Sequence, residues 1–144
     1  MIRRAGLEDV NAIAALFRRS FGTLTFLPKL HTPDEDRGYF RGVVADGEVW
    51  VWDEGGVLLG FAALAGDELT HLYVEPDAQV RGIGGALMDR AKERRPGGLR
   101  LWVFQQNENA RHFYERRDFV LVRETDGSGN EERTPDALYA WSSE

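Results

Sequence analysis

The sequence predicts an α/β sandwich built around one mixed sheet of about seven strands. Hydrophobic periodicity switches along the chain between helical spacing and strand alternation, in the order β-α-α-β-β-β-α-β-α-β-β. Glycine turns join three consecutive strands, and strands joined by short turns pair antiparallel. Because the strands do not alternate regularly with helices, this pattern excludes a doubly wound parallel sheet.

The start of the chain predicts one short strand and two helices. Residues 1–5 are expected to form the strand. Residues 8–21 carry apolar side chains at helical spacing, with acidic residues in the first turn, where they favour the helix dipole. In the segment 31–44, Thr32 is the expected N-cap and Pro33 the first residue of a second helix.

Three strands follow the second helix. Their expected bounds are Glu48–Asp53, Val57–Ala65 and Glu68–Val74. The sequence Asp-Glu-Gly-Gly at 53–56 is typical of a hairpin turn, which makes the first two of these strands antiparallel neighbours.

The rest of the chain alternates strands and helices before it closes on two strands. A helix over 83–95 ends at a Pro-Gly-Gly sequence, and the last two strands flank a polar loop over 125–136. The remaining expected elements are a strand over 99–104, a helix over 109–117 and strands over 119–124 and 137–141.

Composition limits the classes of function. The 144 residues are expected to form a single domain, 1–144. The absence of cysteine excludes disulfides and thiolate metal sites, and the three histidines lack the spacing of metal ligands, so no metal is expected. A net charge of −6 argues against nucleic acid as a partner. No apolar run is long enough for a membrane span or a signal peptide, so we expect a cytoplasmic protein with no membrane contact.

A glycine-rich segment between the strand ending at Val74 and the helix starting at 83 indicates a ligand site. Gly82, Gly84 and Gly85 would let an anion approach the backbone amides at the start of a helix, and Arg81 adds a positive charge. A pyrophosphate group is the expected ligand. The alternative is a turn whose glycines only allow close packing of helix and strand.

Two motifs make the chain resemble the GNAT superfamily of acyl-CoA-dependent N-acyltransferases. The first, Q/R-x-x-G-x-G/A, is matched by Gln79, Gly82 and Gly84. The second, N-x-x-A-x-x-F-Y-x-x-x-G-F, is matched in "NENARHFYERRDF" by the residues Asn107, Ala110, Phe113, Tyr114 and Phe119. Asp118 stands where this motif has glycine, but aspartate tolerates a left-handed backbone, so we expect the turn to persist.

The resemblance implies both the fold and the donor substrate. It implies a GNAT-like, mostly antiparallel sheet with helices on both faces, in which strands four and five splay apart. It also implies that acetyl-CoA binds against the exposed backbone edge of strand four, with its pyrophosphate on the amides after it. The residues expected to bind acetyl-CoA are Leu72, Tyr73, Val74, Gln79, Val80, Arg81, Gly82, Ile83, Gly84, Gly85, Asn107 and Ala110.

The chemistry needs an acid for the leaving thiolate and a route for the proton of the amine. Asn107, Ala110 and Tyr114 are spaced i, i+3, i+7, so they are expected to share one helical stripe, with Tyr114 as the general acid. Amides near the end of strand four would polarise the thioester carbonyl. His71 and Glu75 are both candidates for the general base, and a chain of water molecules is an equal alternative.

The acceptor is expected to be a primary amine on a small molecule or a peptide. Acidic residues in the loop 125–136, among them Glu131 and Glu132, could attract a cationic amine, or could simply be solvated. A homodimer is left open. The alternative function is an acyl-CoA-binding sensor or regulatory module without significant turnover.

Overall fold

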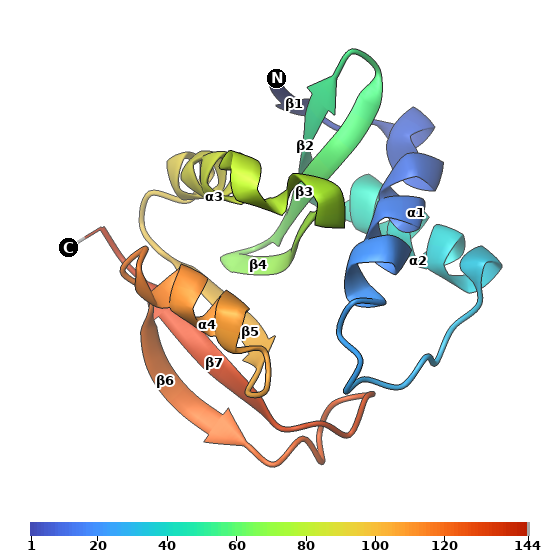
Figure 1. Cartoon of the computed structure of the whole chain (residues 1–144). Helices are drawn as coiled ribbons and strands as arrows, with labels where there is room; N and C mark the ends of the chain where they lie inside the picture. Colours follow the sequence, from blue (N-terminus) through green and yellow to red (C-terminus); the bar gives the residue numbers. More distant parts are fainter. Residues whose placement is uncertain (144) are drawn as a thin grey trace.

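The computed structural model describes residues 1–143, and the side chain of Val80 also lies outside the description. Its centre is a seven-stranded sheet with the order β1-β2-β3-β4-β5-β7-β6, in which only β4 and β5 pair in parallel (Figure 1). The strands are β1 (Ile2–Arg4), β2 (Glu48–Glu54), β3 (Val57–Ala65), β4 (Glu68–Val74), β5 (Leu99–Phe104), β6 (Val120–Thr125) and β7 (Asp136–Trp141). The predicted fold class is therefore confirmed.

Four α-helices connect these strands, close to the predicted bounds. They are α1 (Val10–Phe21), α2 (Pro33–Asp46), α3 (Ile83–Arg94) and α4 (Glu108–Glu115). Thr32 caps α2, as predicted: its hydroxyl accepts a hydrogen bond from the Glu35 amide, and the Glu35 carboxylate accepts one from the Thr32 amide. A short 3-10 helix, Pro76–Arg81, was not predicted and shortens the loop before α3.

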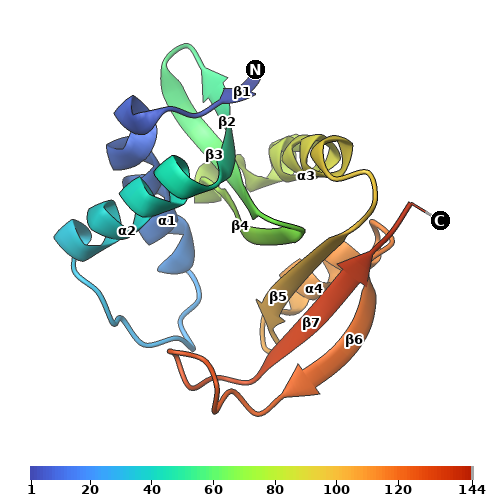
Figure 2. The same cartoon turned by 180° about the vertical axis from the view of Figure 1, so that it is seen from behind.

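The helices cover both faces of the sheet (Figure 2). On one face, α1 and α2 pack over β2 and β3 around a core that includes Ile13, Phe40 and Phe61. On the other face, a second core that includes Leu87 and Tyr139 lies beneath α3 and α4. The sheet is thus the middle layer, and each face contributes apolar area that would otherwise remain in water.

The side chains of β4 alternate between these two cores, as strand geometry requires. Leu72 and Val74 pack with the core beneath α3 and α4. Tyr73 packs with the core beneath α1 and α2, and His71 lies among the aromatic rings of that same core. Strand β4 therefore presents a different set of side chains to each side of the molecule.

Strands β4 and β5 meet only at one end and then diverge. Their one paired position joins Glu68 to Arg100, where the Arg100 amide donates to the carbonyl oxygen of Asp67 at 2.9 Å. Beyond this point the two strands separate, which Figure 1 shows below β4. The predicted splay is confirmed, and it leaves an edge of β4 available within the sheet.

Candidate active site

A cleft of about 700 Å³ occupies the space where β4 and β5 separate. Its walls come from β4, the end of β5, the C-terminal end of α1, the glycine segment and α4. The predicted site residues that line it are His71, Leu72, Tyr73, Val74, Gln79, Gly82, Gly84, Gly85, Asn107, Ala110 and Tyr114. Among the described residues, Glu75, Arg81 and Ile83 belong to the predicted site but do not line the cleft, and the side chain of Val80 is outside the description.

The β4 edge offers backbone hydrogen bonds to a ligand. The amide of Glu75 donates to the carbonyl oxygen of Leu59 on β3, and Val74 lies opposite Gly60. Because antiparallel pairs alternate between bonded and unbonded positions, the N–H and C=O groups of Leu72 and Val74 face away from β3, into the cleft. The side-chain amide of Gln79 donates to the carbonyl oxygen of Val74 at 3.3 Å.

The three glycines differ in their surroundings: Gly82 is the N-cap of α3, and Gly84 and Gly85 lie in its first turn. Gly82 has φ of 80°, a left-handed conformation that side chains other than glycine rarely adopt. A Cβ on Gly84 would lie 3.4 Å from Cε1 of Phe113 and 3.6 Å from Cγ2 of Val74. A Cβ on Gly85 would lie 2.8 Å from Nη2 of Arg117. Gly82 thus meets a turn requirement, a Cβ on Gly84 would make ordinary van der Waals contacts, and a Cβ on Gly85 would meet the Arg117 side chain.

Arg81 is occupied by an ion pair on the outside of the cleft. Its Nη1 and Nη2 atoms donate to the two carboxylate oxygens of Glu54 at 2.9 and 2.7 Å. Hydrogen bonding to Glu54 raises the pKa of Arg81, and the same contact lowers the pKa of Glu54. We expected the charge of Arg81 to be available at the glycine segment. In the structure Glu54 binds this charge, a contact that the sequence did not indicate.

Asn107 lies just before α4 and not within it. Its Oδ1 accepts a hydrogen bond from the Ala110 amide at 3.3 Å, which makes it the N-cap of the helix. The prediction that Asn107 shares a helical stripe with Ala110 and Tyr114 is wrong in this respect, because the helix begins one residue later. Asn107 nevertheless lines the cleft.

Tyr114 projects from α4 toward the cleft. Its ring packs against Phe113 and Phe119, with ring centroids 5.5 and 5.9 Å away. Burial raises the pKa of the Tyr114 phenol to about 12. The phenol is therefore protonated at neutral pH and able to donate a hydrogen bond. Asp118, which ends this segment, has φ of 71°, so the expected left-handed turn persists without glycine.

His71 lies in a group of aromatic side chains. Its Nε2 is 3.1 Å from the Tyr39 hydroxyl, and its Nδ1 is 2.9 Å from the Thr70 hydroxyl. Rings of Phe40 and Phe61 lie 5.3 and 6.3 Å from the imidazole. Burial lowers the pKa of His71 to about 4, so the ring is neutral at pH 7 but a weak base.

Glu75 is held by an arginine from α1. Its carboxylate accepts hydrogen bonds from Arg19, with Nε at 2.9 Å from each oxygen and Nη2 at 2.6 Å from Oε2. This pair ties the end of β4 to α1. Both oxygens of the second base candidate are therefore engaged.

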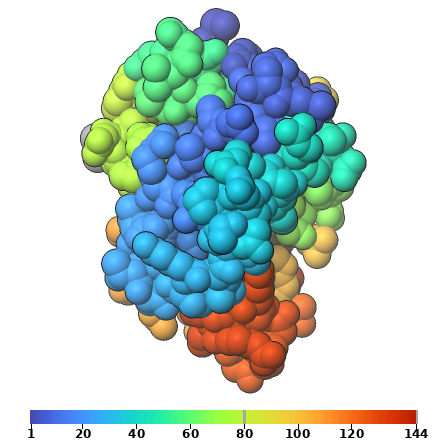
Figure 3. Space-filling model, turned by 90° about the vertical axis from the view of Figure 1, so that its right-hand side faces the viewer, coloured from blue at the N-terminus to red at the C-terminus, as the bar shows by residue number. Residues whose placement is uncertain are grey.

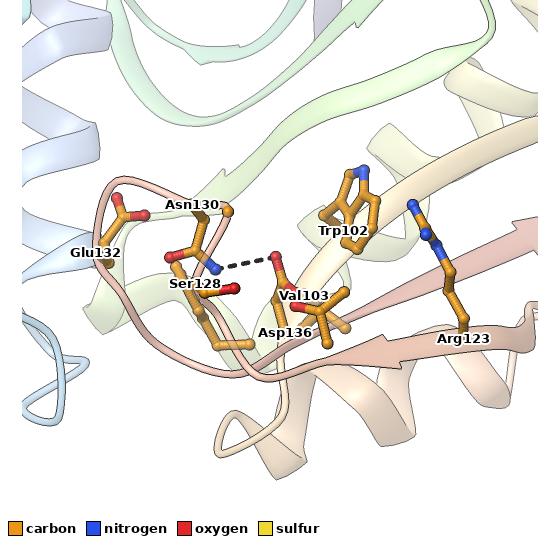
Figure 4. A pocket seen from close by; sticks show the side chains of 10 residues that line it. Trp102, Val103, Arg123, Ser128, Asn130, Glu132 and Asp136 are labelled. Carbon is orange, nitrogen blue, oxygen red and sulfur yellow. Dashed lines mark hydrogen bonds between the residues drawn. The ribbon is translucent and has the colours of Figure 1, made fainter.

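A second groove of about 610 Å³ lies along β5, β6 and β7, under the loop between β6 and β7. It shares Trp102, Val103 and Phe104 with the cleft, so the two spaces meet at the end of β5. In Figure 4, Arg123 and Glu132 stand at opposite ends of this groove, with Trp102 between them. Arg123 lies over the Trp102 ring at 5.4 Å from its centroid.

The segment between α1 and α2 meets the loop between β6 and β7 at the rim of these two spaces. An imidazole nitrogen of His31 contacts the Glu131 carboxylate, and Phe26 packs edge-on to Phe104 at 6.1 Å. Figure 3 shows the two segments side by side, in light blue and in orange-red. Segments separated by a hundred residues thus form one rim.

Sequence reasoning missed Tyr39 and Arg117. Tyr39 contacts His71 from α2, and no local pattern predicts that contact. Arg117 lies just beyond Arg116, the C-cap of α4, but its spacing from Gly85 along the chain gives no reason to pair them. Within residues 1–143, no group of histidine and acidic side chains is suited to hold a metal ion. No helix in that range has the length and apolar composition of a membrane span.

The comparisons with known proteins agree with this geometry. Residues 45–121 match the family model described as an acetyltransferase (GNAT) domain. The peptidyl-lysine N-acetyltransferase YiaC of Escherichia coli is 42% identical over 80 residues, which are 55% of this chain and 54% of YiaC. The chain thus matches about half the length of that relative.

Two further comparisons cover most of the chain. The peptidyl-lysine N-acetyltransferase YjaB of Salmonella typhimurium is 30% identical over 126 residues, which are 84% of this chain and 83% of YjaB. The solution structure of apo-form YjaB from Escherichia coli superimposes with a TM-score of 0.80 at 26% identity, covering 98% of this chain and 96% of that one. With its splayed sheet, its glycine segment and these matches, the chain belongs to the GNAT family of acetyltransferases.

Proposed function

We propose that this protein transfers an acetyl group from acetyl-CoA to a primary amine, by direct attack and without a covalent enzyme intermediate. One observation carries the proposal: the exposed backbone edge of β4, the glycine segment and the Tyr114 phenol all border the same cleft. These are the three parts that a thioester substrate needs, namely a partner for its amide-rich arm, a place for its phosphates and a donor for its leaving thiolate.

The donor would bind mainly through the backbone. The N–H and C=O groups of Leu72 and Val74 can pair with the amides of an extended arm, as an added strand would. Gln79, which now donates to the Val74 carbonyl, would give up that bond to the arm. The amides at the start of α3 suit a pyrophosphate, since the first amides of a helix have no partner within it. Ala110 leaves the cleft wall shallow on the α4 side.

In the transfer step the amine nitrogen attacks the thioester carbonyl carbon, a C–N bond forms, and the C–S bond breaks. An amide at the end of β4 would hydrogen-bond the carbonyl oxygen as it gains negative charge. Tyr114 would donate a hydrogen bond to the departing sulfur. The departing thiolate takes up one proton and becomes the thiol of coenzyme A, while the nitrogen loses one of the two protons of the neutral amine as the amide forms.

For the base, the contacts favour water over either side-chain candidate. Glu75 is bound through both oxygens to Arg19, outside the cleft lining. His71, with a pKa of about 4, is some six units less basic than a lysine amine near 10.4. The amine would therefore enter the reaction already neutral, having released its proton to solvent.

For the acceptor, we propose a lysine side chain of a peptide or protein. YiaC and YjaB are both peptidyl-lysine N-acetyltransferases, and the second groove offers room for chain flanking the lysine. Burial raises the pKa of Tyr39 at the edge of the cleft, and the charges of Glu131 and Glu132 raise it further, so these acids face the same region. Their negative charge would attract the lysine ammonium before it loses its proton.

The test is thiol release from acetyl-CoA with a panel of amines. The panel holds lysine peptides, free lysine, a polyamine and an aminoglycoside, with the Gly84→Val variant as the control. Lysine peptides should give the highest kcat/KM, and the rate should rise about tenfold per pH unit between pH 7 and 9, following the neutral amine. Retention of this pH slope in His71→Gln and Glu75→Gln would support water as the base.

Two outcomes would overturn parts of the proposal. Binding of acetyl-CoA without turnover on any amine would favour the alternative, a sensor module. Turnover only on small amines would replace the peptide acceptor. A homodimer and a cytoplasmic location stay predictions, which light scattering and cell fractionation can test.

A further inference from the structure

We infer that the Arg117 guanidinium binds a phosphate group of the donor nucleotide, and that Gly85 exists to give it room. This inference rests on acetyl-CoA as the proposed donor. Arg117 follows α4 in the chain, and it lines the cleft together with Gly82, Gly84 and Gly85. It is therefore a cation at the place where the phosphates of the donor would lie.

The orientation of Arg117 is fixed by Phe113 on the preceding helix, α4. Its Cζ lies 3.8 Å from the centroid of the Phe113 ring, and its Nη1 donates to the carbonyl oxygen of Phe113 at 3.2 Å. Stacking on an aromatic ring and one hydrogen bond hold the planar group in place before any ligand arrives. The ordering cost of a flexible arginine is thus reduced in advance.

Gly85 on α3 lies beside the stacked guanidinium of Arg117. The 2.8 Å between Nη2 of Arg117 and a Cβ on residue 85 is closer than real contacts allow, so a side chain there would require the end of the Arg117 side chain to shift from its stacked position. Gly84 lies against the same Phe113 ring on which Arg117 stacks. Hence Gly85 leaves space for the Arg117 guanidinium, Gly84 lies in contact distance of the Phe113 ring, and Gly82 is required by its backbone conformation.

The partners of Arg117 leave it available for an anion. In the described part of the chain, no carboxylate forms an ion pair with Arg117, whereas Arg81 is bound at both nitrogens by Glu54. Lys92 donates to the backbone carbonyl of Arg117 at 2.6 Å, which brings a second positive charge near it. Although the whole chain is acidic, the described residues that line the cleft include Arg116 and Arg117 and no carboxylate, while Asp118 and Asp89 lie near Lys92.

Two groups on the donor share the required chemistry: the pyrophosphate and the 3′-phosphate of its nucleotide. Both carry oxygens that a guanidinium can bind in a fork. Coenzyme A and dephospho-coenzyme A, which lacks the 3′-phosphate, distinguish the two sources. The readout is binding of the free coenzymes by calorimetry, independent of catalysis.

The decisive variant is Arg117→Gln, with Arg90→Gln as the matched control. Arg117→Gln should weaken coenzyme A binding about 10- to 100-fold, the effect expected for loss of charge-assisted hydrogen bonds. Arg90→Gln should change it less than about threefold, because Arg90 lies on α3 outside the lining of the cleft and pairs with Glu93. Arg117→Lys should recover only part of the loss, since lysine lacks the planar fork. Thermal unfolding checks that each variant is folded.

A second variant removes no charge. Gly85→Ala should shift the guanidinium and weaken coenzyme A binding, by no more than Arg117→Gln does, with little further loss when both changes are combined. If dephospho-coenzyme A also binds more weakly to Arg117→Gln, the ligand is the pyrophosphate. If only coenzyme A is affected, the ligand is the 3′-phosphate.

The outcomes separate this inference from the proposed function. If the wild-type protein binds acetyl-CoA and a folded Arg117→Gln variant binds coenzyme A equally well, the role of Arg117 is refuted while the donor stands. If the wild-type protein binds neither acetyl-CoA nor coenzyme A, the proposed donor fails, and the role of Arg117 fails with it.

Discussion

Replacing Tyr114 by phenylalanine removes one hydroxyl group from the cleft. Within residues 1–143 that hydroxyl has no hydrogen-bond partner, and the ring itself packs against Phe113 and Phe119. Phenylalanine keeps those ring contacts. The substitution should therefore leave stability almost unchanged and act on the reaction alone.

The size of the effect follows from the pKa of the phenol. Tyr114 has a pKa of about 12, whereas a thiol has a value near 8.5. Complete proton transfer to the thiolate would be uphill by roughly 3.5 units, on the order of 5 kcal/mol. Tyr114 should therefore stabilise the thiolate as a hydrogen-bond donor. Such a bond to a charged group is worth about 1.5–3 kcal/mol, so kcat should fall roughly 10- to 150-fold.

The assay is steady-state thiol release, measured with thermal unfolding on the same samples. The affinity for acetyl-CoA and the melting temperature should hardly change in Tyr114→Phe. Because the pKa of the Tyr114 phenol is about 12, the rate of the wild-type protein should not fall through ionisation of this group at any pH below about 11, and the pH–rate profile of Tyr114→Phe should have the same shape. Tyr73→Phe is the matched control, since Tyr73 also lines the cleft but packs with the opposite core. A stable Tyr114→Phe variant with full turnover would refute the assignment, and a loss in Tyr73→Phe alone would move the acid to that residue.

Three other substitutions test the site and the fold. Gly84→Val should abolish acetyl-CoA binding in a folded protein. A Cβ at this position would already lie 3.4 Å from the Phe113 ring, so the methyl groups of valine would press on that ring. An unchanged affinity measured by calorimetry would contradict this prediction. The double change Glu131→Gln with Glu132→Gln should raise KM for a lysine peptide and spare that for acetyl-CoA; equal kinetics would refute a role of both acids in acceptor binding. Burial would raise the pKa of Glu48, but hydrogen bonds from two arginines and a tryptophan outweigh this and lower it to about 2. Since the folded value lies below the unfolded one, the carboxylate contributes stability above about pH 4.5 that disappears as the pH falls toward 2. Glu48→Gln should flatten that part of the stability curve against pH by roughly 3 kcal/mol, and an unchanged curve would exclude the role.

The sequence determined the elements and their order because these depend on local physics. The alternating pattern of β4 decided which of its side chains enter each core, and the outcome for Leu72 and His71 agreed. The Thr32 cap and the left-handed turn at Asp118 were likewise predicted from residue type. The glycine segment was also located, because three glycines between a strand and a helix are a local signal.

The tertiary structure alone decided which of the candidate side chains are available for chemistry. Glu54 binds Arg81 from a hairpin 27 residues away, and Arg19 binds Glu75 from 56 residues away. Periodicity cannot predict such contacts, since they depend on how separate elements approach one another in space. Burial among aromatic rings, which lowers the pKa of His71, has the same origin.

The glycine segment shows the division most clearly. Its sequence indicated that the backbone lies close to a ligand or to a neighbouring element. The left-handed conformation of Gly82 could be expected from a turn. That Gly85 faces the guanidinium of Arg117 follows only from the packing of α4 beside α3. A glycine in the sequence indicates that space is left beside the backbone. Which group occupies that space depends on the neighbouring element, because van der Waals contacts act only over a few ångströms.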